Sequence, residues 1–255
     1  MNVYFASVEN RGSEALCQEY AYRQPCLLVS YEYIDIVYPF FGRMKIRYWA
    51  LDSGAFSAFS SGSTVTLAGY MDCIRRLRDT PYPPDIHFAL DEIGDWQRSK
   101  RNTELMWAKG FEAIPTFHVG EPWDLLVGYA RDYPRIALGG VARLRGRGKL
   151  NFAKECFSRV WPKHVHGLGF SPTISNLTTV PFHSIDATSW QMGPLIFSNF
   201  SVAYKGLKNR HVAPHVAAAT LKRHVEHGLK MEQLADAYWK REYEELRCLS
   251  PSVVA

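Results

Sequence analysis

Residues 48–56 read Tyr48-Trp49-Ala50-Leu51-Asp52-Ser53-Gly54-Ala55-Phe56. A short apolar run that ends in an aspartate is typical of a buried strand whose last side chain is polar. Similar runs precede Asp91 and Asp186. Because a parallel barrel takes its catalytic groups from the carboxyl ends of its strands, we expect these three aspartates to meet at one mouth of a barrel.

Short β-rich runs alternate with longer amphipathic runs through most of the chain. The expected strands are Val3–Val8, Cys26–Tyr31, Arg47–Asp52, Ile86–Asp91, Ala113–His118, Arg135–Leu138, Val165–Gly169 and Ser184–Asp186. The expected helices are Ser13–Arg23, Thr66–Thr80, Asp95–Lys109, Pro122–Tyr133, Leu150–Trp161 and Pro172–Val180. This alternation indicates βαβ units and a parallel sheet. Eight such units favour a closed α/β fold, a (β/α)8 TIM-like barrel, and the G-x-G-x-x-G fingerprint of dinucleotide-binding sheets is absent.

Two helix starts carry a proline signal. Ser171 followed by Pro172 predicts an N-cap with proline at the first helical position. Glu121 followed by Pro122 predicts the same placement, with an acidic residue at the positive end of the helix dipole.

The C-terminal part of the chain differs from the rest. Residues His211–Arg247 are mostly helix-forming and are expected to pack on the barrel exterior as one or two helices, with Gly228 as the break between them. A length of 255 residues suits one domain. We therefore expect a single unit, with the barrel over 1–200 and a C-terminal helical extension over 201–255.

Composition sets the broad class of protein. Hydrophobic residues make up 47% and charged residues 22%, which suits a packed core. No run approaches 18 apolar residues, so no membrane span is expected. The first residues lack the features of a signal peptide, and the cytoplasm is the expected location. Five scattered cysteines without a CxxC pair predict buried thiols, with neither a disulfide framework nor a cysteine zinc site.

Three carboxylates at one mouth have a chemical use. A single aspartate after a strand is usually a helix cap or a turn former. Clustered carboxylates instead push their pKa values apart, so that one stays ionised while another carries a proton. That division suits a nucleophile working with an acid/base partner. The pair Gly139-Gly140 predicts either close approach of the backbone to a flat ligand or a tight barrel turn.

Five short motifs, in order, resemble the tRNA-guanine transglycosylase superfamily. They look closest to its short phage and bacterial branch, which includes the 7-deazaguanine DNA transglycosylases. The motifs are Asp52-Ser53-Gly54-Ala55-Phe56, Leu90-Asp91-Glu92, Leu138-Gly139-Gly140, Gly167-Leu168-Gly169-Phe170-Ser171-Pro172 and Ile185-Asp186-Ala187-Thr188-Ser189-Trp190. The resemblance covers residues 50–190.

The resemblance implies a role for each matching residue. Asp186 matches the nucleophile that attacks C1′ of the nucleotide sugar, and Asp52 matches the acid/base aspartate of the first motif. Asp91 matches the carboxylate that reads the Watson–Crick edge of the purine. The backbone of Gly139 and Gly140 matches the part that contacts the base carbonyl.

Further residues are expected to line the same base pocket. His118 stands where the family usually has a base-reading glutamine. Ser53 belongs to the first motif, and Gly169 lies in the stretch that leads to the nucleophile strand. The rings of Phe56, Phe170 and Trp190 either sandwich the base or belong to the ordinary core.

The sequence departs from the tRNA-acting members in two places. Their C-terminal zinc motif is absent, and Ala187-Thr188-Ser189-Trp190 replaces the Pro-Thr-Arg that often follows the nucleophile. Both departures argue against tRNA as the substrate and favour DNA or a different RNA. Two basic clusters are expected to hold phosphates on either side of a flipped nucleotide, or to form a solvated face. They consist of Arg143, Arg145, Arg147 and Lys149 after the glycine pair, and of Lys205 and Lys208 after the eighth strand.

The functional hypothesis is a base-exchange transglycosylase. It replaces guanine in nucleic acid with a 7-deazaguanine such as preQ0, through a covalent aspartyl-glycosyl intermediate and with no metal or cofactor. A retained configuration at C1′ requires two displacements, as in retaining glycosidases, and the target base must leave its stack. The alternatives are a tRNA-guanine transglycosylase, a nucleoside or nucleotide N-glycosidase, and a non-catalytic nucleic-acid-binding barrel. A homodimer or a partner protein stays open.

Overall fold

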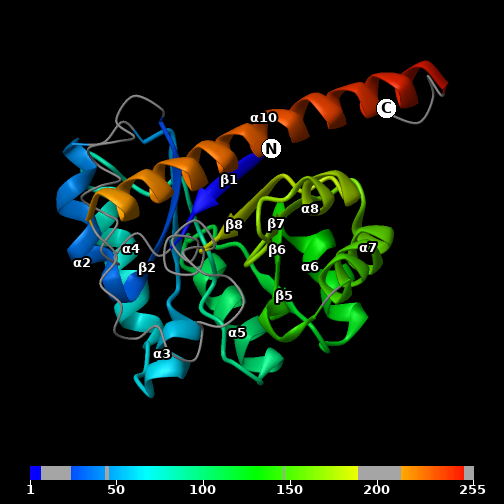
Figure 1. Cartoon of the computed structure of the whole chain (residues 1–255). Coiled ribbons are helices and arrows are strands. Elements are labelled where there is room, and N and C mark those ends of the chain that lie inside the picture. Colours follow the sequence, from blue (N-terminus) through cyan, green and yellow to red (C-terminus); the bar gives the residue numbers. More distant parts are fainter. Residues whose placement is uncertain (7–23, 44–45, 146, 189–213, 250–255) are drawn as a thin grey trace.

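The computed structural model of the chain describes residues 1–6, 24–43, 46–145, 147–188 and 214–249. In the last of these ranges, side chains are described for residues 225–242. The described residues form a ring of parallel strands with helices around it (Figure 1). The N-terminal strand lies in the ring, and one long helix crosses the outside beside it.

Eight parallel strands make up the sheet of the described chain. They are β1 (Asn2–Phe5), β2 (Cys26–Ser30), β3 (Tyr48–Asp52), β4 (Ile86–His87), β5 (Thr116–His118), β6 (Arg135–Gly139), β7 (His164–Gly167) and β8 (Ser184–Ala187). Their order is β4-β3-β2-β1-β8-β7-β6-β5. A parallel bridge between Phe88, just after β4, and Ile114, just before β5, joins the two edges of the sheet, and Ala89 N–H donates to the Ile114 carbonyl at 2.9 Å. The sheet therefore closes, and the expected (β/α)8 barrel is confirmed.

Helices follow most of the strands. They are η1 (Tyr31–Tyr33), α2 (Ile34–Val37), η2 (Tyr38–Arg43), α3 (Ala55–Ser61), α4 (Leu67–Arg78), α5 (Trp96–Ala108), α6 (Trp123–Asp132), η3 (Val141–Arg143), α7 (Gly148–Val160), α8 (Ile174–Thr179) and α10 (Pro214–Leu249). The helical turns over 31–43 and α3 are not predicted by the sequence. The helix expected at Ser13–Arg23 and the boundary expected at residue 200 lie outside the described residues.

Both proline-based helix starts are wrong by one or more residues. The N-cap of α8 is Thr173, whose hydroxyl accepts from Asn176 N–H at 3.2 Å, and not Ser171. The carbonyl of Ser171 instead accepts from the Asn176 amide at 2.7 Å. Pro122 is the N-cap of α6 rather than its first residue, and the Glu121 side chain bonds to the preceding strand. A side-chain hydrogen bond therefore caps the start of α8, whereas α6 begins without one.

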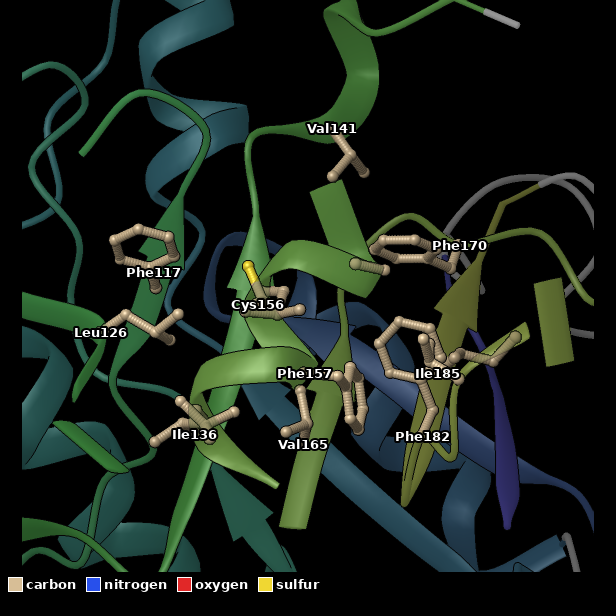
Figure 2. Packing of buried hydrophobic residues seen from close by; sticks show 14 of the residues in the cluster. Phe117, Leu126, Ile136, Val141, Cys156, Phe157, Val165, Phe170, Phe182 and Ile185 are labelled. Carbon is tan, nitrogen blue, oxygen red and sulfur yellow. The ribbon is translucent and has the colours of Figure 1, made fainter. Parts of the chain in front are cut away.

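Strand alternation separates the barrel interior from the helix-covered exterior. On β6 and β7, Ile136 and Val165 pack with Phe157 and Phe182 in one cluster (Figure 2). Leu138 belongs to the same cluster, to which α6, α7 and α8 also contribute side chains. Ala137, the residue between Ile136 and Leu138 on β6, belongs to the interior cluster. Because side chains alternate, every second residue near the carboxyl end of a strand faces the mouth of the barrel.

The helix α10 is continuous, so the break expected at Gly228 is wrong. A Cβ atom added at Gly228 would lie 2.9 Å from Phe5 Cζ, and the glycine lets the helix approach β1 closely. One turn after Gly228, Glu232 accepts from Val3 N–H at 2.8 Å. Further along α10, Trp239 Nε1–H donates to the Leu177 carbonyl at 2.7 Å. The glycine therefore marks a close contact with the barrel and not a helix end.

Two expectations from composition can be compared with the described part of the chain. Cys26, Cys73 and Cys156 are buried and unbridged, as expected. Among the helices of the described ranges, none has the length and apolarity needed to cross a membrane.

Candidate active site

The carboxyl mouth of the barrel brings the predicted aspartates together. Asp52 ends β3 and pairs in register with Ser30, while Asp186 lies on β8 opposite Tyr4. Asp91 follows the short β4 strand in the loop that enters α5. The negative charges of Asp91 and Asp186 both raise the pKa of Asp52, so the three carboxylates act on one another across the mouth.

Asp52 is a carboxyl group whose pKa lies well above its ordinary value. Burial, followed by the charges of Asp91 and Asp186, raises its pKa from 3.8 to about 7, although a backbone hydrogen bond from Gly54 opposes the rise. The Gly54 N–H donates to Asp52 Oδ2 at 3.0 Å. Gly54 has a φ of +76° and caps α3, which brings its N–H back toward the strand end. Asp52 can therefore carry a proton near neutral pH and release it.

Asp186 is held through a single oxygen. Gly169 N–H donates to Oδ1 at 3.0 Å, and His166 Nε2 lies 3.4 Å from the same atom. The side chain of Lys149 donates to the Gly169 carbonyl at 3.1 Å and so steadies the loop that carries this donor. Among the described residues, no partner is found for Oδ2, and Asp186 is only 6% exposed.

Asp91 belongs to a second charged group with His118 and Glu121. His118 Nε2 lies 3.2 Å from Asp91 Oδ2, and Nδ1 lies 3.3 Å from Glu121 Oε1. Burial disfavours a charged His118, but the hydrogen bonds to both carboxylates outweigh it and raise the pKa of His118 to about 10. Burial raises the pKa of Asp91, and the contact with His118 limits that rise. The ring therefore stands as an imidazolium between two carboxylates at neutral pH.

The predicted glycine pair supports this histidine. A Cβ atom at Gly139 would lie 2.9 Å from Thr116 Cγ2 and 3.0 Å from His118 Cδ2. Gly140 has a φ of +71° and its added Cβ would lie 3.2 Å from Val119 N. The pair thus turns the chain and admits the His118 ring against β6. Contact of its backbone with a base stays a prediction.

The remaining predicted pocket residues fall into different places. Ser53 is buried, and its hydroxyl accepts from Ala55 N–H at 3.4 Å at the start of α3. Phe56 is 64% exposed on α3 and is not a core residue. Phe170 is fully buried with its ring centroid 4.8 Å from that of Phe182, so its proposed place in a base sandwich is wrong. Trp190 lies outside the described residues.

The basic residues after β6 lie on the loop at the carboxyl mouth. Arg143 ends the turn η3, and it is exposed together with Arg145 and Arg147. Lys149 is engaged with the Gly169 carbonyl, so it has a structural contact that sequence reasoning did not foresee. Lys205 and Lys208 lie outside the described residues. In the described ranges, no group of three or more His, Cys, Asp or Glu side chains has the arrangement of a metal site.

Two residues of the site are missed by sequence reasoning, Glu121 and His166. Glu121 is interpreted above as a helix-start residue, although it lies three positions after His118 in a tight turn. His166 lies two positions before Leu168 on a strand that has no acidic residue at its end. Its alternation with Val165 indicates an interior side chain, but only the pairing of β7 with β8 brings it to Asp186.

The fold and site define a (β/α)8 barrel with three interacting carboxylates at its carboxyl mouth. No protein-family model matches the chain, and no curated protein matches it. Solved structures similar to the chain include mutant forms of the tryptophan synthase alpha-subunit from the hyperthermophile Pyrococcus furiosus. One is 13% identical with a TM-score of 0.49, over 89% of this chain and 96% of that chain. Another is 13% identical with a TM-score of 0.48, over 90% and 97%. Nothing about the activity of this chain follows from these values.

Proposed function

We propose that the chain is a base-exchange transglycosylase that replaces guanine in nucleic acid with a 7-deazaguanine such as preQ0. The observation that carries the proposal is the different surroundings of two neighbouring carboxyl groups, Asp52 and Asp186. The pKa of Asp52 is raised to about 7 by burial and by Asp91 and Asp186. Asp186, in contrast, accepts a backbone N–H and faces a histidine. One group suits proton transfer and the other suits nucleophilic attack.

The first displacement uses both groups. A carboxylate oxygen of Asp186 attacks C1′ of the target nucleotide, and the C1′–N9 bond breaks. The electron pair of that bond leaves with the guanine, which takes the proton of Asp52. The products are a glycosyl ester on Asp186, free guanine and an ionised Asp52. This is the double-displacement logic of retaining glycoside chemistry.

The second displacement restores the site. The incoming 7-deazaguanine transfers its N9 proton to the Asp52 carboxylate and attacks C1′ through N9. The ester bond breaks, and its electron pair returns to Asp186. The sugar keeps its original configuration because two inversions have taken place at C1′.

The charged group around His118 supports recognition of a purine edge. Asp91 offers carboxylate oxygens to N–H donors of guanine, as the family resemblance implies. His118 is protonated at neutral pH and presents donors only. Glu121 holds the ring from the side opposite Asp91, at 3.3 Å from Nδ1. A site with fixed donors and acceptors discriminates strongly against a base that cannot pair with them.

DNA is the proposed polymer. Ala187-Thr188-Ser189-Trp190 stands where the tRNA-acting members often have Pro-Thr-Arg. The exposed side chains of Arg143, Arg145 and Arg147 follow β6 at the carboxyl mouth and are suited to phosphate contacts. tRNA is the second substrate to test.

The experiment measures base exchange directly. The unaltered chain is incubated with guanine-containing DNA, or with tRNA, and labelled preQ0, and the nucleosides are then analysed by mass spectrometry. We expect label in the DNA, and a DNA–protein adduct on a denaturing gel when the incoming base is withheld. Asp186→Ala and the isosteric Asp186→Asn should abolish both, while the exposed Asp72→Asn on α4 should leave both unchanged.

The other outcomes identify the alternatives. Label only in tRNA would indicate a tRNA-guanine transglycosylase. Abasic sites that form with or without added base would indicate an N-glycosidase, in which water resolves the ester. Salt-dependent DNA binding without adduct, exchange or abasic product would refute catalysis and leave a nucleic-acid-binding barrel.

A further inference from the structure

His166 is a buried histidine that no sequence motif assigns to the reaction. It lies on β7 with a side chain only 3% exposed, inside the barrel. The rings of Phe88 and Tyr4 pack around it, with centroids 4.9 Å and 5.7 Å away. The ring is therefore fixed in place by aromatic packing and cannot swing freely.

Both ring nitrogens of His166 have partners on β8. Nδ1 lies 2.7 Å from the Ser184 hydroxyl, and Nε2 lies 3.4 Å from Asp186 Oδ1. Ser184 and Asp186 are two positions apart on one strand, so both face the interior. The histidine thus spans two neighbouring interior positions of β8.

The oxygen that faces His166 Nε2 indicates which ring nitrogen carries the hydrogen. Asp186 Oδ1 already accepts from Gly169 N–H, so a contact with a bare Nε2 would place two acceptors against each other. A hydrogen on Nε2 makes the contact attractive. The Ser184 hydroxyl can donate to Nδ1 in that state, because a hydroxyl rotates to suit its partner.

We propose that His166 is a positioning residue that donates Nε2–H to Asp186 Oδ1 and leaves Oδ2 as the attacking oxygen. Gly169 N–H donates to the same Oδ1 at 3.0 Å, so two donors converge on one oxygen. Two bonds to one oxygen fix the rotation of the carboxyl group and aim the other oxygen toward the mouth. The catalytic part of this inference rests on the proposed function, whereas the hydrogen bond does not.

The first test concerns the hydrogen bond and needs no activity. The chain is labelled with ¹⁵N-histidine, and long-range ¹H–¹⁵N spectra identify which ring nitrogens carry hydrogen. His166→Gln, by loss of one set of signals, assigns His166 among the nine histidines. We expect hydrogen on Nε2, and a shift of that signal in Asp186→Asn. A ring with hydrogen on Nδ1 alone would overturn the inference, whatever the chain catalyses.

The second test separates positioning from structure. His166→Phe keeps an aromatic ring but removes the donor, and it should slow adduct formation with DNA about 100-fold, the scale expected for a misplaced reacting group. The affinity for free preQ0 should not change, since the base pocket is intact. His166→Gln places an amide N–H near the position of Nε2 and should recover most of the rate. His183→Gln is the matched control, since it replaces an exposed histidine just before the amino end of β8.

The outcomes of the two tests can be told apart. If the unaltered chain forms no adduct, the proposed function fails, and the NMR result still decides the hydrogen bond. If it forms adduct but His166→Phe, folded and binding preQ0, reacts at the same rate, the positioning role is refuted. Equal losses in His166→Phe and His166→Gln would likewise refute a role through the Nε2 donor.

Discussion

Replacing Asp52 with asparagine should stabilise the free protein while it removes the proton that the proposed reaction needs. In the folded chain, burial and the charges of Asp91 and Asp186 disfavour an ionised Asp52 and raise its pKa to about 7. A raised carboxyl pKa means that stability is greatest below the unfolded pKa and falls as the pH rises toward the folded pKa. Asparagine carries no charge at any of these pH values. Its side-chain oxygen can still accept from Gly54 N–H, which lies 3.0 Å from Asp52 Oδ2.

The size of the effect follows from the two pKa values. A change from 3.8 to about 7 costs about 4 kcal/mol of folding free energy once the pH exceeds both, at about 1.4 kcal/mol for each tenfold change in proton affinity. This is an upper limit, since the Asp52 side chain keeps some contact with solvent. By linkage, the loss of folding free energy is about 1.6 kcal/mol at pH 5. Between pH 5 and pH 8 a further ~2.5 kcal/mol is lost. Below pH 3.8 the cost vanishes.

Urea denaturation at pH 5 and pH 8 measures this difference. Asp52→Asn should gain stability over the unaltered chain at both values, and the gain should be larger at pH 8. Asp72→Asn is the matched control, because Asp72 is exposed beside Arg75 and surface pairs contribute about 0–1 kcal/mol. The same Asp52 variant should lose about 10²–10⁴-fold in base exchange, the range for general acid–base catalysis. A gain that is absent at pH 8, or equal at the two pH values, would refute the electrostatic reasoning.

Three other predictions concern separate parts of the molecule. Glu121→Gln removes one of the two carboxylates beside His118, so the pKa of His118 should fall from about 10 in an NMR titration yet stay above 6.5; an unchanged value would contradict the pairing. Gly228→Ala should destabilise the chain by about 1–3 kcal/mol in urea, since its Cβ would meet the phenylalanine of β1 at 2.9 Å. Gly128→Ala in α6, where an added Cβ meets nothing within 4 Å, should gain up to about 1 kcal/mol, and equal effects at both glycines would refute the close-contact argument. Arg143→Ala should weaken DNA binding and reduce the slope of log affinity against log salt by about 1, and an unchanged slope would place Arg143 away from phosphate.

The barrel and the meeting of the aspartates follow from local patterns in the sequence. Apolar runs that end in Asp52 and Asp186 mark strand ends, and period-two alternation places both side chains inward. Parallel strands share one carboxyl edge, so their last residues meet without any knowledge of long-range contacts. The same reasoning placed His118 on this edge, three residues before the glutamate that pairs with it.

Other features depend on contacts between distant parts of the chain and have no local signal. Gly228 resembles a helix end in sequence, but its role is set by Phe5, which lies more than two hundred residues earlier. Phe170 belongs to a motif that suggests base stacking, yet it fills space beside Gly167, where an added Cβ would lie 2.8 Å from the ring. Thr173 became the cap of α8 because its hydroxyl, and not that of Ser171, reaches a free N–H of the first turn.

The electrostatics of the mouth favour chemistry over simple binding of a polyanion. A phosphate-binding surface gains affinity from cations and loses it from carboxylates, whereas this mouth holds Asp52, Asp91 and Asp186 together with Glu121. His118 offsets part of that charge, but both of its ring nitrogens are already paired with carboxylates, those of Asp91 and Glu121. Burial and the charges of Asp91 and Asp186 disfavour the ionised form of Asp52 and raise its pKa to about 7. A pKa shift of that size reduces the stability of the folded chain at neutral pH. A role of Asp52 in proton transfer, as proposed above, would explain why the chain keeps such a group.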